Sequence, residues 1–288
     1  MSNIFFTKMT GAGNDFIFID KKKNPALSLD HERIRKLCNR RFGVGADGVI
    51  IIDDIDGYDF RMSYFNADGS TGSLCANGAR CSIRFAEHSV RLNNKKASFI
   101  ANSVQYTGEV IDEELILFNL NEPKNVLINK RLNLPEEIIN YSFADTGSPH
   151  VVVNIDDIFD AASNQKKVFN GIDEVPVFRL GREIRLHNEF KPAGTNVNFI
   201  QLLGDIVHIR TYERGVEDET LACGTGSVAS AIIASLSNNF KPPITLKTFG
   251  GDNLIVNFKF ENQKFEDITL TGPARVVFEG SADEKFFL

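Results

Sequence analysis

The stretch Leu74-Cys75-Ala76-Asn77-Gly78-Ala79-Arg80-Cys81 has a near copy at Ala222-Cys223-Gly224-Thr225-Gly226-Ser227. In both copies a cysteine and small residues lead into a run with apolar residues at helical spacing, so we predict that each cysteine lies at the start of a helix. The similarity extends to neighbouring residues, because Tyr64 and Tyr212 are 148 residues apart, as the two cysteines are. The chain therefore contains two related halves with a cysteine at the same place in each.

A fainter second similarity joins the segments 10–14 and 146–150, which are 136 residues apart. Because the two offsets, 148 and 136, differ by 12 residues, we expect an insertion of that size in the second half, between its first strand and its cysteine helix. Two repeats are too few for a solenoid. We expect an α/β (α+β) protein of two pseudo-symmetric domains, with the two helix N-termini facing each other across a cleft.

The segment Asn121-Glu122-Pro123 has the composition of a linker between the halves. Alternating strand patterns close the chain, and we expect the last of them, around 276–279, to return to the first domain. The predicted domains are therefore residues 1–122 with 274–288, and residues 123–273.

Composition excludes several classes of protein. The chain has 288 residues, is 42% hydrophobic and has a formal net charge of −6, which argues against a nucleic-acid-binding surface. No apolar run approaches the roughly 18 residues that a membrane span needs, and the N-terminus lacks the pattern of a signal peptide. We therefore expect a cytoplasmic protein with no membrane partner.

Two patterns in the sequence do not indicate a metal or cofactor site. The four cysteines, Cys38, Cys75, Cys81 and Cys223, show no C-x-x-C spacing, so we expect neither a structural zinc site nor disulfides in a cytoplasmic chain. Cys38 is expected to pack in the core, on a helix predicted over 30–41. The segment Gly43-Val44-Gly45-Ala46-Asp47-Gly48 matches G-x-G-x-x-G, but it follows a predicted helix and precedes a strand, the reverse of a dinucleotide-binding turn.

The start of a helix favours negative charge, because its first N–H groups lack intrahelical acceptors and the helix dipole is positive there. A thiol at this position has a lowered pKa, and the same N–H groups can hold a carboxylate. The duplication brings further polar residues to equivalent places: His150 corresponds to Asn14, Arg214 to Asn66, and Asn196 to Gly48. With Glu213, these residues complete a candidate site.

Two thiols on opposite sides of one α-carbon can invert its configuration. One, as a thiolate, removes the α-proton, and the other, as a thiol, returns a proton to the opposite face. Fixed helix N–H groups stabilise the charge that develops on the carboxylate. Because two thiolates would repel each other, we expect the pair to share one proton, with His150 and Glu213 adjusting the pKa values of the thiols.

These residues resemble those of the diaminopimelate epimerase family. The resemblance covers nearly the whole chain and rests on residues 66–70 and 75–81, on Glu213-Arg214-Gly215 with 222–226, and on the turns at 11–16 and 147–150. It implies two domains, each a curled, mostly antiparallel sheet or barrel around a central helix, often in a homodimer. It also implies cofactor-independent conversion of L,L- to meso-diaminopimelate, on the route to lysine and, in many bacteria, to peptidoglycan.

Carried over to this chain, the resemblance implies that Cys75 and Cys223 are catalytic and that the reaction needs no metal. The residues expected to bind the substrate are Asn14, Asn66, Ala76, Asn77, Asn196, Glu213, Arg214, Gly224 and Thr225. Three positions depart from the frequent family pattern: Ala76 replaces Gly, Ser148 replaces Asn, and Gly48 stands where some members have Gln. Ala76 is tolerable if its φ is negative.

Other functions remain open at this stage. A proline or hydroxyproline racemase-like enzyme would use the same pair of cysteines. A non-catalytic amino-acid-binding relative, or a thiol redox sensor, would keep the cysteines without the epimerisation. The Asn66 and Glu213-Arg214 signatures favour a long substrate with a polar far end.

Overall fold

The computed structural model describes residues 3–167 and 169–287. It divides into two compact units, Met1–Asn119 with Thr271–Leu288, and Leu120–Leu270. The chain therefore leaves the first unit once and returns to it at the C-terminus. The limits proposed from the sequence place each boundary about three residues further along the chain.

The first unit is a curled sheet around a buried helix. Its strands pair in the order β18-β1-β2-β3-β4-β5-β6-β7, with β2/β3 and β4/β5 parallel and the other pairs antiparallel. The strands are β1 (Asn3–Gly11), β2 (Asn14–Asp20), β3 (Gly48–Asp53), β4 (Phe60–Asn66), β5 (Lys96–Ala101), β6 (Val104–Val110), β7 (Leu115–Asn119) and β18 (Arg275–Asp283). The antiparallel pairing of β18 with β1 confirms that the last strand returns to the first domain.

The second unit repeats this topology. Its strands pair in the order β8-β9-β10-β12-β13-β15-β16, with β10/β12 and β13/β15 parallel, and short strands β11 and β14 add to β9 and β13. The strands are β8 (Lys124–Asn133), β9 (Glu137–Asp145), β10 (Pro149–Asn154), β11 (Ile158–Asp160), β12 (Asn196–Leu203), β13 (Ile206–Glu213), β14 (Asp218–Thr220), β15 (Ile244–Thr248), β16 (Asn253–Glu261) and β17 (Lys264–Pro273).

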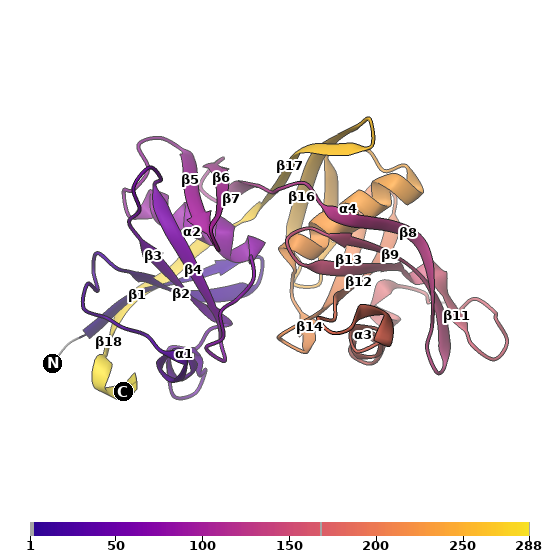
Figure 1. Cartoon of the computed structure of the whole chain (residues 1–288), viewed down its shortest axis with the longest axis horizontal. Coiled ribbons are helices and arrows are strands. Elements are labelled where there is room, and N and C mark those ends of the chain that lie inside the picture. The colour runs from indigo at the N-terminus through magenta and orange to yellow at the C-terminus, as the bar shows by residue number, and fades with distance from the viewer. Residues whose placement is uncertain (1–2, 168, 288) are drawn as a thin grey trace. The chain divides into compact units, whose positions relative to one another are not determined.

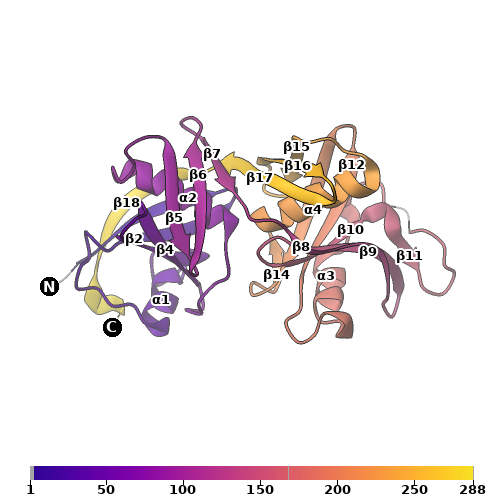
Figure 2. The ribbon, with the colours of Figure 1, turned by 45° about the horizontal axis from the view of Figure 1, so that its top comes forward.

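The central helices follow the two cysteines. Helix α2 (Ala76–His88) connects the parallel strands β4 and β5, and α4 (Gly224–Asn238) connects β13 and β15. Residues 76–86 of α2 and 224–234 of α4 are all buried, as is expected of helices covered on every side. Figures 1 and 2 show α2 against the strands of the first unit and α4 against those of the second. The predicted helices at Cys75 and Cys223 are confirmed.

The outer helices connect the other parallel pairs. Helix α1 (His31–Cys38) joins β2 to β3, and α3 (Val177–Arg185) joins β10 to β12. Each buries one side only, through Ile34, Leu37 and Cys38 in α1 and through Val177, Leu180, Gly181 and Ile184 in α3. The second connection also holds β11 and three 3₁₀ turns, Ile155–Asp157, Ile172–Glu174 and Asn188–Phe190, which places the predicted insertion here. The chain ends in a fourth 3₁₀ turn, Glu284–Phe287.

Helix α1 is shorter than the predicted span of 30–41. Asp30 caps it by accepting a hydrogen bond from Arg33 N at 2.9 Å, as expected, but the helix ends at Cys38. The glycine-rich loop then folds back, and the N–H groups of Val44 and Gly45 donate to Leu37 O, while that of Ala46 donates to Cys38 O. These N–H groups cap the helix C-terminus, and the loop follows a helix and precedes β3, as predicted.

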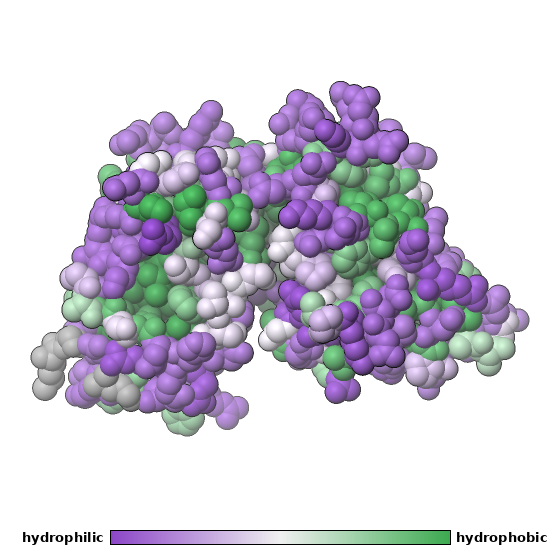
Figure 3. All heavy atoms as spheres, viewed as in Figure 1, coloured by the Kyte–Doolittle hydropathy of each residue, from purple (hydrophilic) through white to green (hydrophobic). Residues whose placement is uncertain are grey.

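Three strands and one α-helix were not predicted from the sequence, namely β8, β11, β14 and α3, and neither were the 3₁₀ turns. The residues of β8 are mostly polar and exposed, so they show no clear strand pattern. Helix α3, in contrast, has apolar residues at helical spacing after Pro176, and this signal was missed. The visible face in Figure 3 is largely hydrophilic, with smaller hydrophobic areas between. Within the described ranges, no helix is long and apolar enough to cross a membrane.

Candidate active site

The first half-site is built at the N-terminus of α2. Cys75 is the N-cap residue, and its half-buried Sγ accepts a hydrogen bond from Gly78 N at 3.4 Å. Ala76 and Asn77 form the first turn of α2, where N–H groups lack intrahelical acceptors. Ala76 therefore has the negative φ of a helical residue, and the methyl group that distinguishes it from glycine is accommodated.

Asn14 and Asn77 are joined by a directional chain of hydrogen bonds. Arg80 Nη2 donates to Asn77 Oδ1 at 2.8 Å, and Asn77 Nδ2 donates to Asn14 Oδ1 at 2.6 Å. Asn14 Nδ2 then donates to Asp47 Oδ2 at 3.1 Å. Because one end of the chain is a guanidinium and the other a carboxylate, the orientation of both amides is determined.

The acidic end of this chain is held by further charges. Arg40 bonds both carboxylate oxygens of Asp15, at 2.6 and 2.9 Å, and Asp47 at 2.7 Å, and Lys8 pairs with Asp15 at 2.7 Å. Burial alone would raise the pKa of Asp15, but the hydrogen bonds and charges of Arg40 and Lys8 lower it to about 2. Sequence reasoning did not identify Asp15, Arg40 or Asp47, which the turn brings to Asn14.

Asn66, the last residue of β4, lies apart from this chain of hydrogen bonds. Its Nδ2 donates to Ser70 Oγ at 3.0 Å, and Ser70 in turn bonds Asp68. This turn connects β4 to the segment that carries Cys75. Its role toward a substrate stays a prediction.

The second half-site is built at the N-terminus of α4. Cys223 is the N-cap residue, with 7% of its surface exposed, and Gly224 and Thr225 are the first residues of the helix. Thr225 Oγ1 lies 3.6 Å from Cys223 Sγ and 2.9 Å from His150 Nε2. Thr225 and Asn77 are 148 residues apart, as the two cysteines are, and the residues that they contact, His150 and Asn14, are also equivalent in the duplication.

His150 is fully buried among polar groups. Its Nε2 lies 2.9 Å from Ser148 Oγ, and its Nδ1 lies 3.1 Å from Asn198 Nδ2. Burial lowers the pKa of His150 to about 3, and the positive charge of Arg214 lowers it further. His150 is therefore a neutral imidazole at physiological pH, and its contact to Cys223 runs through Thr225.

Asn196 pairs with His150 where β12 runs beside β10. Glu213 is the last residue of β13, which pairs with β12, and Arg214 follows it. Asn196 Nδ2 donates to Pro149 O at 3.0 Å and to Ser148 Oγ at 3.3 Å, while its Oδ1 accepts from Arg214 N at 2.9 Å. Glu213 Oε2 accepts from Thr220 Oγ1 at 3.0 Å. Arg214 is half-buried, and its Nη1 donates to Ala193 O at 3.3 Å. Asn198 and Thr220 were missed by the sequence reasoning.

The other two cysteines are unsuited to proton transfer. Cys38 and Cys81 are buried, and burial raises the pKa of each thiol to about 12. Both therefore remain protonated across the physiological range. Cys38, the last residue of α1, belongs to a buried apolar cluster with residues of β1, β2 and β3, which confirms its predicted place in the core.

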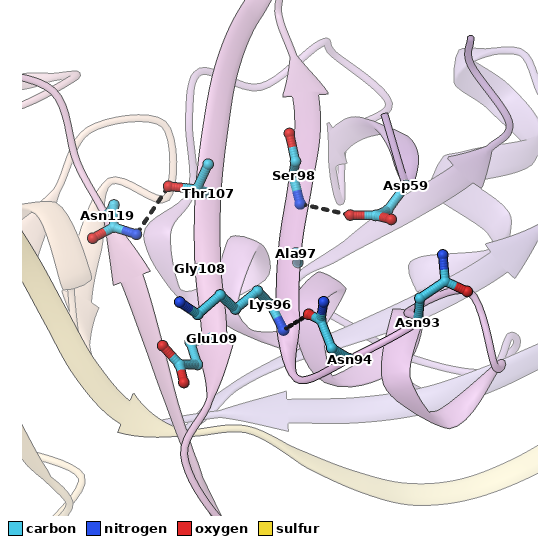
Figure 4. Close-up of a pocket in the computed structure, with 10 residues that line it drawn as sticks. All are labelled: Asp59, Asn93, Asn94, Lys96, Ala97, Ser98, Thr107, Gly108, Glu109 and Asn119. Carbon is cyan, nitrogen blue, oxygen red and sulfur yellow. Dashed lines mark hydrogen bonds between the residues drawn. The ribbon is translucent and has the colours of Figure 1, made fainter. Parts of the chain in front are cut away.

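A polar hollow lies elsewhere, on β5, β6 and β7 of the first unit (Figure 4). It has a volume of about 460 Å³ and contains none of the predicted site residues. Its polar groups bond one another: Ser98 N donates to Asp59, Asn119 Nδ2 to Thr107, and Lys96 N to Asn94.

Comparisons with known proteins agree with one another. A family model described as diaminopimelate epimerase matches residues 6–124 and 142–277. A diaminopimelate epimerase of Chlorobaculum tepidum is 40% identical over 276 residues, which cover 95% of this chain and 99% of the relative. One of Aquifex aeolicus is 38% identical over 296 residues, covering 97% and 98%.

Solved structures share the fold at lower identity. A phenazine biosynthesis protein of the PhzF family from Bacillus anthracis superposes with a TM-score of 0.69 at 14% identity, covering 98% of this chain and 100% of that one. A hydroxyproline epimerase from Agrobacterium vitis does so with a TM-score of 0.68 at 11% identity, covering 97% and 92%. At this identity the likeness concerns the fold, and it confirms the predicted two-domain α/β class.

Proposed function

Because the chain belongs to the diaminopimelate epimerase family, we propose that it is an isomerase that converts L,L-2,6-diaminopimelate to meso-diaminopimelate. The observation that carries the proposal is the family match together with two cysteines that occupy the same N-cap position in duplicated half-sites. The proposed chemistry uses no cofactor, because the two thiols supply both the base and the acid.

We assign the base and acid roles to Cys75 and Cys223. In the substrate complex the proposal requires their thiols to reach opposite faces of one α-carbon, so that a proton leaves one face and enters the other. A proton on the pair is shared, because two adjacent thiolates repel. Which thiol is charged depends on which epimer is bound, since each direction of the reaction begins with the opposite thiol as base.

The helix N-termini are assigned to the α-carboxylate. Removal of the α-proton places additional charge on the carboxylate oxygens, and donors fixed toward that charge contribute about 2.7–4 kcal/mol each in comparable sites. The donors proposed here are the first-turn N–H groups of α2, from Ala76 and Asn77, and of α4, from Gly224 and Thr225. Asn14, Asn66, Asn196, Glu213 and Arg214 are proposed to bind the remaining groups of the substrate.

An isotope experiment tests this function. L,L-diaminopimelate is incubated with the protein in D₂O, and the product is analysed by mass spectrometry and proton NMR. We expect one deuterium at the epimerised α-carbon and none at the distal centre. Absence of both epimerisation and α-exchange would exclude the proposed activity. Parallel incubations with proline and hydroxyproline distinguish a racemase acting on those amino acids.

The cellular setting is part of the proposal. Diaminopimelate is a diamino dicarboxylic acid, and we place its epimerisation in lysine biosynthesis and peptidoglycan precursor supply, in the cytoplasm. Growth without added lysine and diaminopimelate of an epimerase-deficient bacterium that carries this gene would test the assignment.

We also propose that the chain forms a homodimer through β18. Val277 and Phe278 are consecutive residues of this strand and so lie on its opposite faces, and with 56% and 48% of their surfaces exposed they leave apolar surface that a partner would cover. Sedimentation analysis of the protein and of Phe278→Asp tests the proposal, since the charged variant is expected to sediment as a monomer.

A further inference from the structure

Asn198 is a polar residue at the centre of a buried, otherwise apolar segment of β12. Its side chain is fully buried, and every polar atom of it has a partner. Nδ2 lies 2.9 Å from Val151 O and 3.1 Å from His150 Nδ1, and Oδ1 accepts a hydrogen bond from Thr211 Oγ1 at 3.0 Å. A buried amide satisfied in this way has one orientation.

The carbonyl of Val151 determines which end of the amide faces His150. A carbonyl oxygen only accepts hydrogen bonds, so the amide atom beside it must be the NH₂ group. That NH₂ group is also the partner of His150 Nδ1, which must therefore be the accepting nitrogen. In a neutral imidazole the proton then resides on Nε2.

The proton on Nε2 faces two hydroxyl groups. Ser148 Oγ and Thr225 Oγ1 each lie 2.9 Å from Nε2, and they are 3.3 Å from each other. Ser148 Oγ also accepts from Asn196 Nδ2. With its two acceptor positions occupied by donors from Asn196 Nδ2 and His150 Nε2, Ser148 Oγ cannot also accept from Thr225 at 3.3 Å, so the Thr225 proton is directed toward Cys223 Sγ at 3.6 Å.

The opposite tautomer of His150 would change the hydrogen bond between Thr225 and Cys223. An unprotonated Nε2 would be an acceptor 2.9 Å from Thr225 Oγ1, and it would compete with the sulfur for the hydroxyl proton. The direction of the Thr225 hydrogen bond therefore depends on the amide of Asn198, which is separated from the sulfur by the side chains of His150 and Thr225.

We propose that Asn198 is a positioning residue of the active site: it holds His150 as the Nε2–H tautomer, so that Thr225 donates its hydroxyl proton to Cys223 Sγ and stabilises the thiolate. The relevance of this thiolate to catalysis rests on the proposed function. The contacts from Asn198 through His150 and Thr225 to Cys223, which we call the relay, lie within the second unit alone.

The hydrogen bonds described for the first half-site follow a different arrangement. Ile50 stands 148 residues before Asn198, and the pair of amides Asn14 and Asn77 occupies the place of His150 and Thr225. Cys75 Sγ instead accepts from a backbone N–H, that of Gly78. The duplicated thiols therefore have different donors, and only Cys223 should respond to changes at Asn198.

Nitrogen-15 NMR of the histidine rings tests the tautomer directly. The His150 signal is assigned by its loss in His150→Gln, and we expect an unprotonated Nδ1 and a protonated Nε2 in the wild-type protein. In Asn198→Asp a carboxylate replaces the amide nitrogen, and we expect the proton to move to Nδ1. A wild-type Nδ1 that carries the proton would overturn the proposal, whatever the variants do.

Titration of the Cys223 thiolate by ultraviolet absorbance tests the consequence. The measurement uses Cys75→Ser, in which Cys223 is isolated because the pKa values of Cys38 and Cys81 are about 12. Loss of one hydrogen bond to a charged group should raise the pKa of Cys223 by about one to two units in Asn198→Asp and in Thr225→Val. Thr225→Ser should restore it, since the hydroxyl is retained.

Ser230→Ala is the matched control. Ser230 lies on the same helix, is fully buried, and its Oγ has no hydrogen-bond partner among the described residues. We expect it to change neither the tautomer nor the thiolate titration. If Thr225→Val left the titration of Cys223 unchanged, the relay would be wrong. Both measurements are independent of turnover, so an intact relay in a protein that fails the D₂O assay would refute the proposed function and leave this inference standing.

Discussion

The reactivity of each proposed catalytic cysteine depends on its position at a helix N-terminus and on a few neighbouring side chains. Cys75 and Cys223 begin helices, and helix N-termini favour the thiolate. Cys38 and Cys81 lie in the same domain as Cys75, but burial keeps them protonated. The difference between a catalytic and a structural cysteine in this chain is thus one of position.

We predict that Cys75→Ala and Cys223→Ala each abolish epimerisation, because an inversion needs a base on one face and an acid on the other. Cys38→Ala is the control and should keep nearly full activity. The rate of meso-diaminopimelate formation measures all three. Near wild-type turnover in either site variant would contradict the two-thiol mechanism.

We predict that Arg214 binds the distal carboxylate of the substrate. Its planar guanidinium suits a carboxylate, and charged hydrogen bonds contribute about 1.5–3 kcal/mol, so Arg214→Met should lower kcat/KM by roughly 10- to 200-fold. An analogue without the distal carboxylate should be a poor substrate for both proteins, with little further loss in the variant. Equal proportional losses on both substrates would show that Arg214 supports the structure of the site instead.

We predict that His150 makes stability depend on pH. Its pKa is about 3 in the folded protein against 6.5 as an unperturbed group, so between these values the unfolded chain binds a proton that the native state does not. The free energy of unfolding therefore rises with pH in this window, by up to roughly 1.4 kcal/mol per pH unit, and this contribution is complete above pH 6.5.

Urea unfolding of the wild-type protein and His150→Gln at pH 7, 6 and 5 measures this dependence. The variant should show a shallower loss of stability on acidification. Asp15 does not interfere at these values, because its pKa falls from 3.8 to about 2 and its contribution is lost at lower pH. Parallel curves for the two proteins would show that the pKa of His150 is the same in the native and unfolded states.

At the scale of secondary structure, the two half-sites come from one arrangement of elements used twice. A parallel strand pair joined by an outer helix is followed by a parallel pair joined by the central helix, in both units. The central helices begin at the cysteines, and each packs closely against neighbouring strands. Glycine is the third residue of both helices, at Gly78 and Gly226.

We predict opposite tolerance of alanine at these two glycines. A Cβ at Gly78 would meet Ile50 Cδ1 at 2.8 Å and Met62 Cε at 3.3 Å, which are the mobile ends of side chains. A Cβ at Gly226 would collide with Asn198 Oδ1 and lie 3.2 Å from His150 Cε1. Gly226→Ala should therefore cost about 1–3 kcal/mol of stability, whereas Gly78→Ala should be nearly neutral, helped by the higher helix propensity of alanine.

Thermal and urea unfolding of both variants give the comparison. Gly171→Ala is a control, because a Cβ there meets no atom within 4 Å. The prediction for Gly226 also includes lower turnover, since the displaced Asn198 is the partner of His150. Equal stability of the two helix variants would show that β12 moves to accept the methyl group.

At the scale of the whole molecule, the proposal makes one demand on the two units: both thiols must serve one substrate. We predict that oxidised glutathione inactivates the free protein by joining Cys75 to Cys223, with two glutathione thiols as the reduced product. A disulfide needs Cα atoms within about 7 Å, so formation of this bond requires the two thiols to approach each other, as the proposed function also does.

Peptide mapping by mass spectrometry without reduction identifies the bond. Dithiothreitol should restore activity, bound substrate should slow the inactivation, and Cys38→Ala should behave like the wild-type protein. Inactivated protein in which Cys75 and Cys223 are both free would show that the thiols do not approach each other.

Much of this protein was predictable from its sequence because the duplication marks equivalent positions. The 148-residue offset places two cysteine helices, and small residues followed by apolar periodicity predict them without any knowledge of packing. The predicted return of the strand around 276–279 to the first domain is confirmed by its pairing with β1. The end of α1 was wrong by three residues, since its C-terminus is determined by N–H groups from the following loop.

The residues that support the site depend on tertiary structure. Asp47 reaches Asn14 from 33 positions away, and Asn198 reaches His150 from 48, through strand pairings that local sequence does not encode. The sequence by itself determined the residue types, their duplication and the helix starts, because these follow from local periodicity and chemistry. Only the folded chain decided the state of His150 and the direction of the hydrogen bond to Cys223, because burial and the partners of a side chain arise when distant strands pair.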